Sequence, residues 1–282
     1  MTEPNTPEVE RVPMGRVRLL RRSGKPRLPL KHRVPAEKLK KGVYLIPSLF
    51  TAGNLICGFF SILSTFKGEY VQAVIFIILA NLLDGLDGYA ARLTKSTSQF
   101  GIEFDSLADI VSFGVAPAVL AYYWALVPWG TYGWLAACLY VVCGALRLSR
   151  FNVQIRNVER SHFVGLPIPA AAEMIGATVI IYYFLGGEGA PSKQIVLLLE
   201  IYVLAGLMVS NFHYLSLKKA DLHKRHPFWM LVSGILLIIF IIAEPQLMYF
   251  TIFLLYTLSG PLLWSFTRRK RRREKRGELV QA

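Results

Sequence analysis

Long apolar stretches follow one another along most of the chain, each about 17 to 25 residues long and separated by short polar connectors. A helix needs about 20 mainly apolar residues to cross the hydrocarbon core of a bilayer. Stretches this long and this uniformly apolar cannot be the alternating strands of a membrane barrel. We therefore expect an all-α fold, a polytopic membrane helical bundle. The pattern predicts eight spans, at about residues 43–66, 70–93, 102–125, 131–149, 167–186, 194–213, 228–244 and 246–266.

The last two predicted spans are separated only by Glu244, Pro245 and Gln246. A proline in such a connector favours a turn, and three residues leave no room for a longer loop. We therefore expect a tight helical hairpin at this point of the chain.

The composition agrees with a membrane protein, since 54% of the residues are hydrophobic and only 18% are charged. So few charged residues cannot cover that much apolar surface in water. With eight spans, all of the 32 Lys and Arg residues except Lys67 and Lys193 fall on the side that holds both termini. Positive residues favour the cytosolic side, so we expect a multi-pass protein of the cell membrane with both termini in the cytosol.

The net charge of +14 comes largely from basic blocks near the two ends of the chain. No folded reader of nucleic acid surrounds either block, so we do not expect nucleic acid as a partner. Basic residues beside a membrane are attracted to anionic lipids, by about 1 kcal/mol each. We expect a partly disordered or interfacial segment over residues 1–42, without a cleavable signal peptide, and a basic cytosolic tail over 267–282.

Four aspartates lie where the second and third predicted spans approach the cytosolic side. Asp105 and Asp109 are four residues apart, so they share a face at the start of the third span. Two antiparallel neighbouring helices would therefore direct two carboxylates each into one space. The matching stripe of the second span, spaced i, i+3, i+4, i+7 and i+8, consists of Asp84, Asp87, Gly88, Ala91 and Arg92.

Four carboxylates in one pocket repel one another, and a single arginine is too little positive charge to balance them. Divalent cations would balance the charge, and a set of oxygen ligands without His or Cys suits Mg²⁺, Mn²⁺ or Ca²⁺ rather than zinc. Two such ions, about 3.5 to 4 Å apart, are a common arrangement for displacement at phosphorus. Gly88 and Ala91 are small, which would let another helix or a phosphate group come close to the backbone.

Two other interpretations of the aspartates stay open from the residues alone. Transporters also place acidic residues in membranes, as parts of ion pathways or proton relays. Some of the aspartates could simply stabilise the start of the third helix, because acidic residues favour helix N-termini. The transport alternative is weakened by the clustering of the acids near one membrane face.

The spacing resembles the signature of the CDP-alcohol phosphotransferase family. That resemblance implies a six-helix catalytic core over residues 43–218, a two-metal site open to the cytosol, a CDP-linked lipid substrate and a homodimer. Residues 219–266 would then form two additional spans. The signature positions present in this chain at the family's spacing are Asp84, Asp87, Gly88, Ala91, Arg92, Gly101, Asp105 and Asp109.

The resemblance also implies roles for single residues. Asp84, Asp87 and Asp105 would hold Mg²⁺ or Mn²⁺, and Asp109 would both touch metal and act as the general base. The family often has Pro-Asn at the start of the first helix, near the nucleotide, where this chain has Pro47 and Ser48. The positions matching contacts to the CDP-lipid are Gly88, Arg92, Ser98 and, with this change of residue type, Ser48.

The acceptor alcohol lies outside the signature. The stretches GALRLSRFN (144–152) and FVGLPIPAAA (163–172) resemble members of the family that use serine. L-Serine carries a carboxylate, which one guanidinium could hold through two hydrogen bonds, so Arg147, Arg150 and Asn152 are the candidate residues for binding serine. The alternative is that both arginines are ordinary basic residues of a cytosolic helix end.

From these observations we expect a membrane enzyme that makes phosphatidylserine and CMP from CDP-diacylglycerol and L-serine. The nearest alternative keeps the chemistry but changes the acceptor to glycerol 3-phosphate or an inositol phosphate, either of which needs a second anion pocket. The more distant alternative is a transporter that uses the same aspartates.

Overall fold

The structure is a computed structural model that describes residues 45–94, 99–156, 165–191, 194–212, 214, 232, 240 and 242–281. These residues form helices and turns and contain no strand. The all-helical prediction is therefore confirmed for the part of the chain that is described. The principal helices are α2 (Leu45–Phe66), α3 (Tyr70–Thr94), α4 (Gln99–Asp109), α5 (Ala116–Ala121), α6 (Thr131–Arg156), α7 (Ile168–Phe184), α8 (Ile195–Val209) and α10 (Pro245–Gln281).

Several of these helices have the length and apolar character of membrane spans. Two shorter apolar helices, α7 and α8, lie where the fifth and sixth spans are predicted. The predicted seventh span, 228–244, falls almost entirely outside the described residues. The bundle is thus that of a multi-pass membrane protein. The stretches that are long and apolar enough to cross a membrane are Ser48–Phe66, Tyr70–Ala90, Gln99–Trp129, Thr131–Val153 and Pro245–Ser265.

Helix ends differ from the predictions mainly on the polar side of each span. The helix predicted to end near residue 149 continues to Arg156, so the prediction of a connector beginning at Arg150 is wrong. Similarly, α10 continues through most of the predicted basic tail, to Gln281. Hydropathy marks where apolar side chains end, whereas Arg, Gln and Lys are good helix formers that let backbone hydrogen bonding continue beyond that point.

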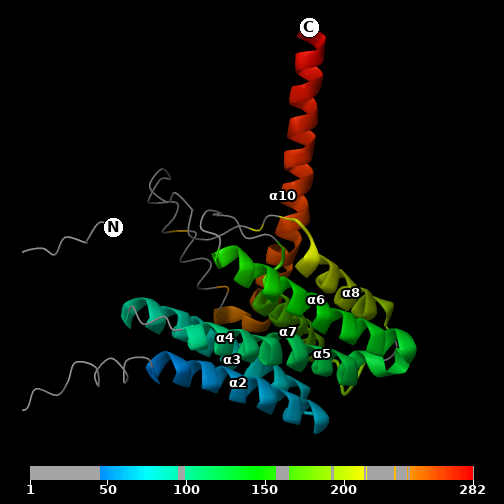
Figure 1. The fold of residues 1–282 in the computed structure, drawn as a ribbon. Helices are drawn as coiled ribbons and strands as arrows, with labels where there is room; N and C mark the ends of the chain where they lie inside the picture. Colours follow the sequence, from blue (N-terminus) through cyan, green and yellow to red (C-terminus); the bar gives the residue numbers. More distant parts are fainter. Residues whose placement is uncertain are drawn as a thin grey trace, which may run out of the picture.

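Helix α2 contacts both of the helices that carry the predicted site, α3 and α4. Helix α2 packs along α3 and also contacts α4, while α7 packs against both α3 and α10, and α6 packs on α8. Figure 1 shows α10 leaving the bundle, with its C-terminal end far from the other labelled helices. Most residues of α7 between Ile168 and Val179 are buried, so α7 is a central helix of the bundle.

The third predicted span is one continuous but irregular helix. After α4 it passes through a π-helical segment, Ile110–Val115, then α5, and then a second π-helical segment, Tyr122–Leu126. Pro117 cannot donate a backbone hydrogen bond to the carbonyl of Phe113, one turn earlier. The buried hydroxyl of Tyr140 on α6 donates to that carbonyl oxygen instead, at 3.2 Å. A neighbouring helix thus supplies a donor to a backbone carbonyl to which Pro117 cannot donate.

Removal of this hydroxyl should destabilise the bundle. We expect Tyr140→Phe to cost about 1–3 kcal/mol, because the buried carbonyl of Phe113 would lose its side-chain donor. The measurement is thermal unfolding of the purified protein in detergent. Tyr132→Phe is the matched control, since Tyr132 is 67% exposed. Equal unfolding temperatures for the two variants would contradict this role for Tyr140.

Helix α2 approaches the π-helical segment very closely. An added Cβ on Gly58 would lie 2.3 Å from Oγ and 2.7 Å from Cα of Ser112, so only glycine fits there without a shift. The Ser112 hydroxyl donates to the backbone oxygen of Asn54, at 2.9 Å. This contact fixes α2 against the helix that carries Asp105 and Asp109.

Candidate active site

Helices α3 and α4 bring three of the four predicted aspartates together. Asp84 comes from α3, and Asp105 and Asp109 come from α4, with a carboxylate oxygen of each within 4.8 Å of the others. The i, i+4 spacing of Asp105 and Asp109 puts both on one face of α4. The acidic parts of α3 and α4 therefore meet, and α2 contacts both helices.

The fourth aspartate, Asp87, is buried and is turned toward α2. Its carboxylate accepts a hydrogen bond from the hydroxyl of Thr51. Asp87 still interacts electrostatically with both Asp84 and Asp105, so all four charges act within one region. The structure therefore gives Asp87 a contact with α2 in addition to its place beside the cluster.

The three clustered carboxylates fit a divalent cation. Their oxygens are hard ligands of the type that Mg²⁺ and Mn²⁺ prefer, and their spacing would let one ion touch all three. Several ionised carboxylates in the membrane region would repel one another strongly without a compensating positive charge. The aspartates thus form a candidate metal centre.

Asn54 is a residue of the site that sequence reasoning missed. Its side-chain nitrogen donates to a carboxylate oxygen of Asp109 at 3.3 Å, and Asn54 itself is fully buried. Its Oδ1 atom is buried and has no hydrogen-bond partner among the described residues. The spacing of Thr51, Asn54, Gly58 and Ser61 in an otherwise apolar span is the signal that could have found this polar face.

A π-helical segment begins directly after Asp109. Such segments are frequent at functional sites, because the wider turn changes the direction in which the neighbouring side chains point. Here Ser112, three residues after Asp109, donates to the backbone oxygen of Asn54. The side-chain amide of Asn54 in turn donates to the carboxylate of Asp109. The local backbone thus links the position of α2 to that of the last aspartate.

Arg147 is the predicted serine-binding residue that lies beside the aspartates. It is 9% exposed and interacts electrostatically with Asp109 and with Tyr256 of α10. Its guanidinium carbon lies 5.3 Å from the ring centroid of Phe151, one turn further along α6, a cation–π distance. A buried arginine of this kind can hold an anionic group of a ligand close to Asp109.

Arg150 and Asn152 have other contacts. Arg150 is exposed and donates to the backbone oxygen of Val209 at 3.4 Å and to Oδ1 of Asn211 at 3.3 Å, so its charge lies at the C-terminal end of α8, where a positive charge is favourable. Asn152 donates to the Ser106 hydroxyl at 2.8 Å and lines a groove of about 280 Å³ between α4 and α6.

That groove lies on a different face of α4 from the aspartates. Glu103, Ser106 and Leu107 line it, and consecutive residues of a helix point about 100° apart, so Asp105 and Asp109 face elsewhere. The structure therefore brings Arg147 to the cluster through the buried face of α6. Asn152 lies on the opposite, more open face of the same helix.

The predicted nucleotide contacts are only partly described. Gly88 lies on α3, and an added Cβ there would meet no atom of the described residues within 4 Å. Close helix packing is therefore not the reason for this glycine, which leaves room beside the backbone for a ligand. Ser48 is in the first turn of α2, three residues before Thr51. The side chain of Arg92, and Ser98 altogether, lie outside the described residues.

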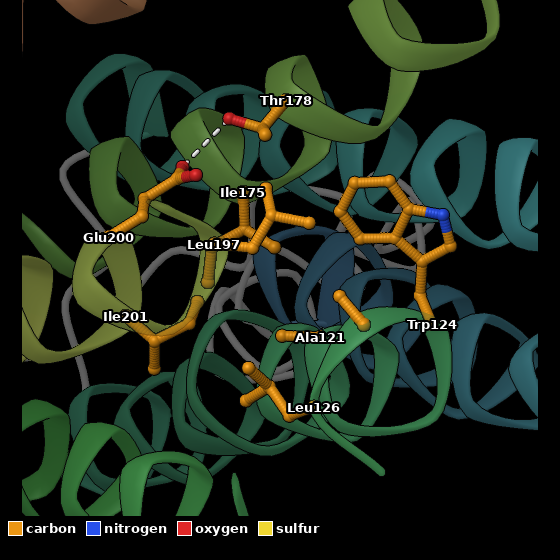
Figure 2. A pocket seen from close by; sticks show the side chains of 9 residues that line it. Ala121, Trp124, Leu126, Ile175, Thr178, Leu197, Glu200 and Ile201 are labelled. Atoms are coloured by element: carbon orange, nitrogen blue, oxygen red, sulfur yellow. Dashed lines mark hydrogen bonds between the residues drawn. The ribbon is translucent and has the colours of Figure 1, made fainter. Parts of the chain in front are cut away.

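A second polar spot in the bundle is too small to hold a substrate. A cavity of about 10 Å³ lies between α7, α8 and the helix around Trp124, with room for about one water molecule. Figure 2 shows the side chains that line it. The Thr178 hydroxyl donates to the carboxylate of Glu200 there, at 2.7 Å. The remaining lining is mostly apolar, so this cavity is part of the core.

Comparison with known proteins gives a consistent result. A sequence model of the CDP-alcohol phosphatidyltransferase family matches residues 44–207. The chain is 40% identical over 231 residues to a CDP-diacylglycerol–serine O-phosphatidyltransferase of Helicobacter pylori, over 79% of this chain and 92% of the relative. It is also 40% identical over 174 residues to the Bacillus subtilis protein of that name, over 62% and 92% of the two chains.

An archaeal relative has a related name. The chain is 39% identical over 171 residues to the archaetidylserine synthase of Methanothermobacter thermautotrophicus, over 60% of this chain and 69% of the relative. Serine thus appears in the names of all three relatives.

Proposed function

Because this chain belongs to the CDP-alcohol phosphatidyltransferase family, we propose that it transfers the phosphatidyl group of CDP-diacylglycerol to the hydroxyl of L-serine, giving phosphatidylserine and CMP. The observation that carries the proposal is the 40% identity to an enzyme of that name over 92% of its length. The arrangement of the aspartates beside a buried arginine supports the same chemistry.

The metal ligands of the site would be Asp84, Asp105 and Asp109, with Asp87 close beside them. The family resemblance implies two ions, either Mg²⁺ or Mn²⁺. When bound, such ions neutralise the diphosphate of the donor and the charge that develops on the leaving phosphate. Three carboxylates within 4.8 Å of one another support this ligand set.

The proton of the serine hydroxyl needs an acceptor, because a neutral alcohol is a poor nucleophile. In our proposal Asp109 takes that proton while the serine oxygen forms a bond to the lipid-bearing phosphorus. The bond from that phosphorus to the bridging oxygen breaks, and CMP leaves with the electron pair. Asn54 supports this role, since its amide donates to one oxygen of Asp109 and orients the carboxylate.

Arg147 would hold the serine carboxylate through two parallel hydrogen bonds. Its burial beside Asp109 supports this assignment, because the carboxylate and the hydroxyl of serine are only a few bonds apart. The contacts of Arg150 with the end of α8 instead favour a structural role for that residue. Asn152 is likewise engaged with Ser106, away from the aspartates.

The donor would lie with its diphosphate near the acidic end of α3 and its acyl chains in the bilayer. The open space beside Gly88 supports an approach of the diphosphate to the backbone there. Contacts of Arg92, Ser98 and Ser48 with the CDP group stay predictions from the family resemblance. The homodimer is a prediction from the same resemblance. The cytosolic orientation of the site and the attraction of the basic ends to anionic lipids stay predictions from the distribution of Lys and Arg.

The test is CMP release by the purified protein in detergent. The assay contains CDP-diacylglycerol and either Mn²⁺ or Mg²⁺, with and without L-serine. We expect release that depends on serine and stops when a chelator removes the metal. Release only with glycerol 3-phosphate or an inositol phosphate would keep the chemistry and overturn the acceptor. If a folded sample released no CMP with any acceptor, the transport interpretation of the aspartates would be favoured.

A further inference from the structure

The buried carboxylate of Glu173, which lies outside the aspartate cluster, links α7 to both α3 and α10. Glu173 lies in α7 and is 1% exposed. Its Oε1 atom accepts a hydrogen bond from the side-chain nitrogen of Asn81 on α3, at 2.8 Å, and its Oε2 atom accepts one from the hydroxyl of Tyr249 on α10. An acidic residue in a membrane bundle is costly, and here both of its oxygens have defined donors.

The hydrogen bond between Asn81 and Glu173 lies about one turn of α3 from the candidate metal centre. Asn81 precedes Asp84 by three residues, so the two share a face of α3 and are about 4.5 Å apart along its axis. A hydrogen bond that fixes Asn81 therefore also fixes the rotation and the depth of the turn that carries Asp84.

The acidic end of α3 has few packing contacts of its own on one side. Within the part of the chain that is described, an added Cβ on Gly85 or Gly88 would meet nothing within 4 Å. The polar contacts that hold this end include the bond from Thr51 to Asp87 and the bond from Asn81 to Glu173. Small shifts of α3 would otherwise change the distance between Asp84 and the two aspartates of α4.

Helix α10 completes this arrangement from outside the part of the chain that the family model matches, residues 44–207. The Tyr249 hydroxyl donates to the Oε2 atom of Glu173. An added Cβ on Gly176, one turn further along α7, would lie 3.4 Å from the same hydroxyl. The close approach of α7 and α10 thus holds the Glu173 side chain in the direction of α3.

We propose that Glu173 is a positioning residue of the active site, which sets the place of Asp84 through Asn81 and is itself held by Tyr249. This inference rests on the proposed metal-dependent function of the aspartates. It gives the last described helix a role in the site, although none of its residues needs to touch the substrates.

The test compares two buried carboxylates. Glu173→Leu removes both hydrogen bonds, whereas Glu200→Leu removes a carboxylate of the same bundle whose described partner is Thr178 on α7 (Figure 2). Two quantities are measured for each variant. One is the Mn²⁺ concentration for half-maximal CMP release, and the other is the Mn²⁺ concentration for half-maximal thermal stabilisation without substrates.

We expect Glu173→Leu to raise both Mn²⁺ concentrations by about tenfold or more, the effect typical of losing a group that orients a metal ligand. Glu173→Gln should restore much of the affinity, since its amide can still accept from Asn81. Glu200→Leu should lower the melting temperature but leave both Mn²⁺ concentrations within about twofold of the parent protein. If Glu173→Leu does not fold, Asn81→Leu and Tyr249→Phe test the proposal instead. We expect both variants to raise the two Mn²⁺ concentrations.

Unchanged Mn²⁺ concentrations in the Glu173, Asn81 and Tyr249 variants would overturn the proposal. Equal shifts in the Glu200 variant would also overturn it, because they would indicate general loosening of the core. The Mn²⁺ concentration for half-maximal thermal stabilisation is measured without substrates, so it tests the positioning role of Glu173 independently of the proposed reaction. Protein that binds Mn²⁺ as expected but never releases CMP would leave the positioning role intact and remove the proposed reaction.

Discussion

Asp109→Asn should abolish phosphatidyl transfer while leaving the protein folded. The substitution keeps the size of the side chain and its hydrogen bond with Asn54 can be retained by the amide oxygen, but it removes both the proton acceptor and a charged metal ligand. General base catalysis alone contributes about 10²- to 10⁴-fold, so we expect a loss of CMP release of at least that size. The measurement is the rate of serine-dependent CMP release in detergent.

Folding of this variant can be checked separately by its melting temperature without metal. That temperature should be equal to or higher than in the parent protein, since one of the repelling carboxylates is gone. Ser106→Ala is a suitable control on the same helix, because Ser106 faces the groove beside Asn152 and not the aspartates. Full activity of Asp109→Asn would remove the proposed mechanism.

Arg147→Met should mainly weaken the binding of serine. Methionine keeps part of the apolar volume but removes the guanidinium, and a charge-assisted contact with a carboxylate is worth about 1.5–3 kcal/mol. We therefore expect KM for L-serine to rise about 10- to 100-fold, with a much smaller change in KM for CDP-diacylglycerol. Initial rates measured while each substrate is varied in turn separate the two effects.

Arg150→Met distinguishes between the two arginines that the sequence offers. Arg150 contacts the C-terminal end of α8, so we expect its replacement to change KM for serine far less than Arg147→Met does. Arg147→Lys is a further comparison, because an ammonium keeps the charge but not the two-point geometry, and its KM should lie between those of the parent and Arg147→Met. A larger rise in KM for the Arg150 variant would reverse our assignment.

Much of the candidate site could be predicted because it is local in sequence. Asp84 and Asp87 lie on one helix and Asp105 and Asp109 on the next, so helical periodicity and a short connector already place them near one another. The contributions of Asn54 and Glu173 were not predicted. Both come from helices distant in sequence, and nothing in a local pattern says which of several polar residues in a span will face a given aspartate.

The helical membrane fold, most of the span positions and the two acidic faces follow from the amino-acid sequence alone, because apolar length and helical spacing depend only on neighbouring residues. The tertiary structure decided which groups meet across helices. It turned Asp87 toward Thr51, placed Arg147 but not Asn152 beside the cluster, and joined Glu173 to α3 and α10. These contacts depend on the rotation and depth of each helix, which packing fixes only when the whole bundle is assembled.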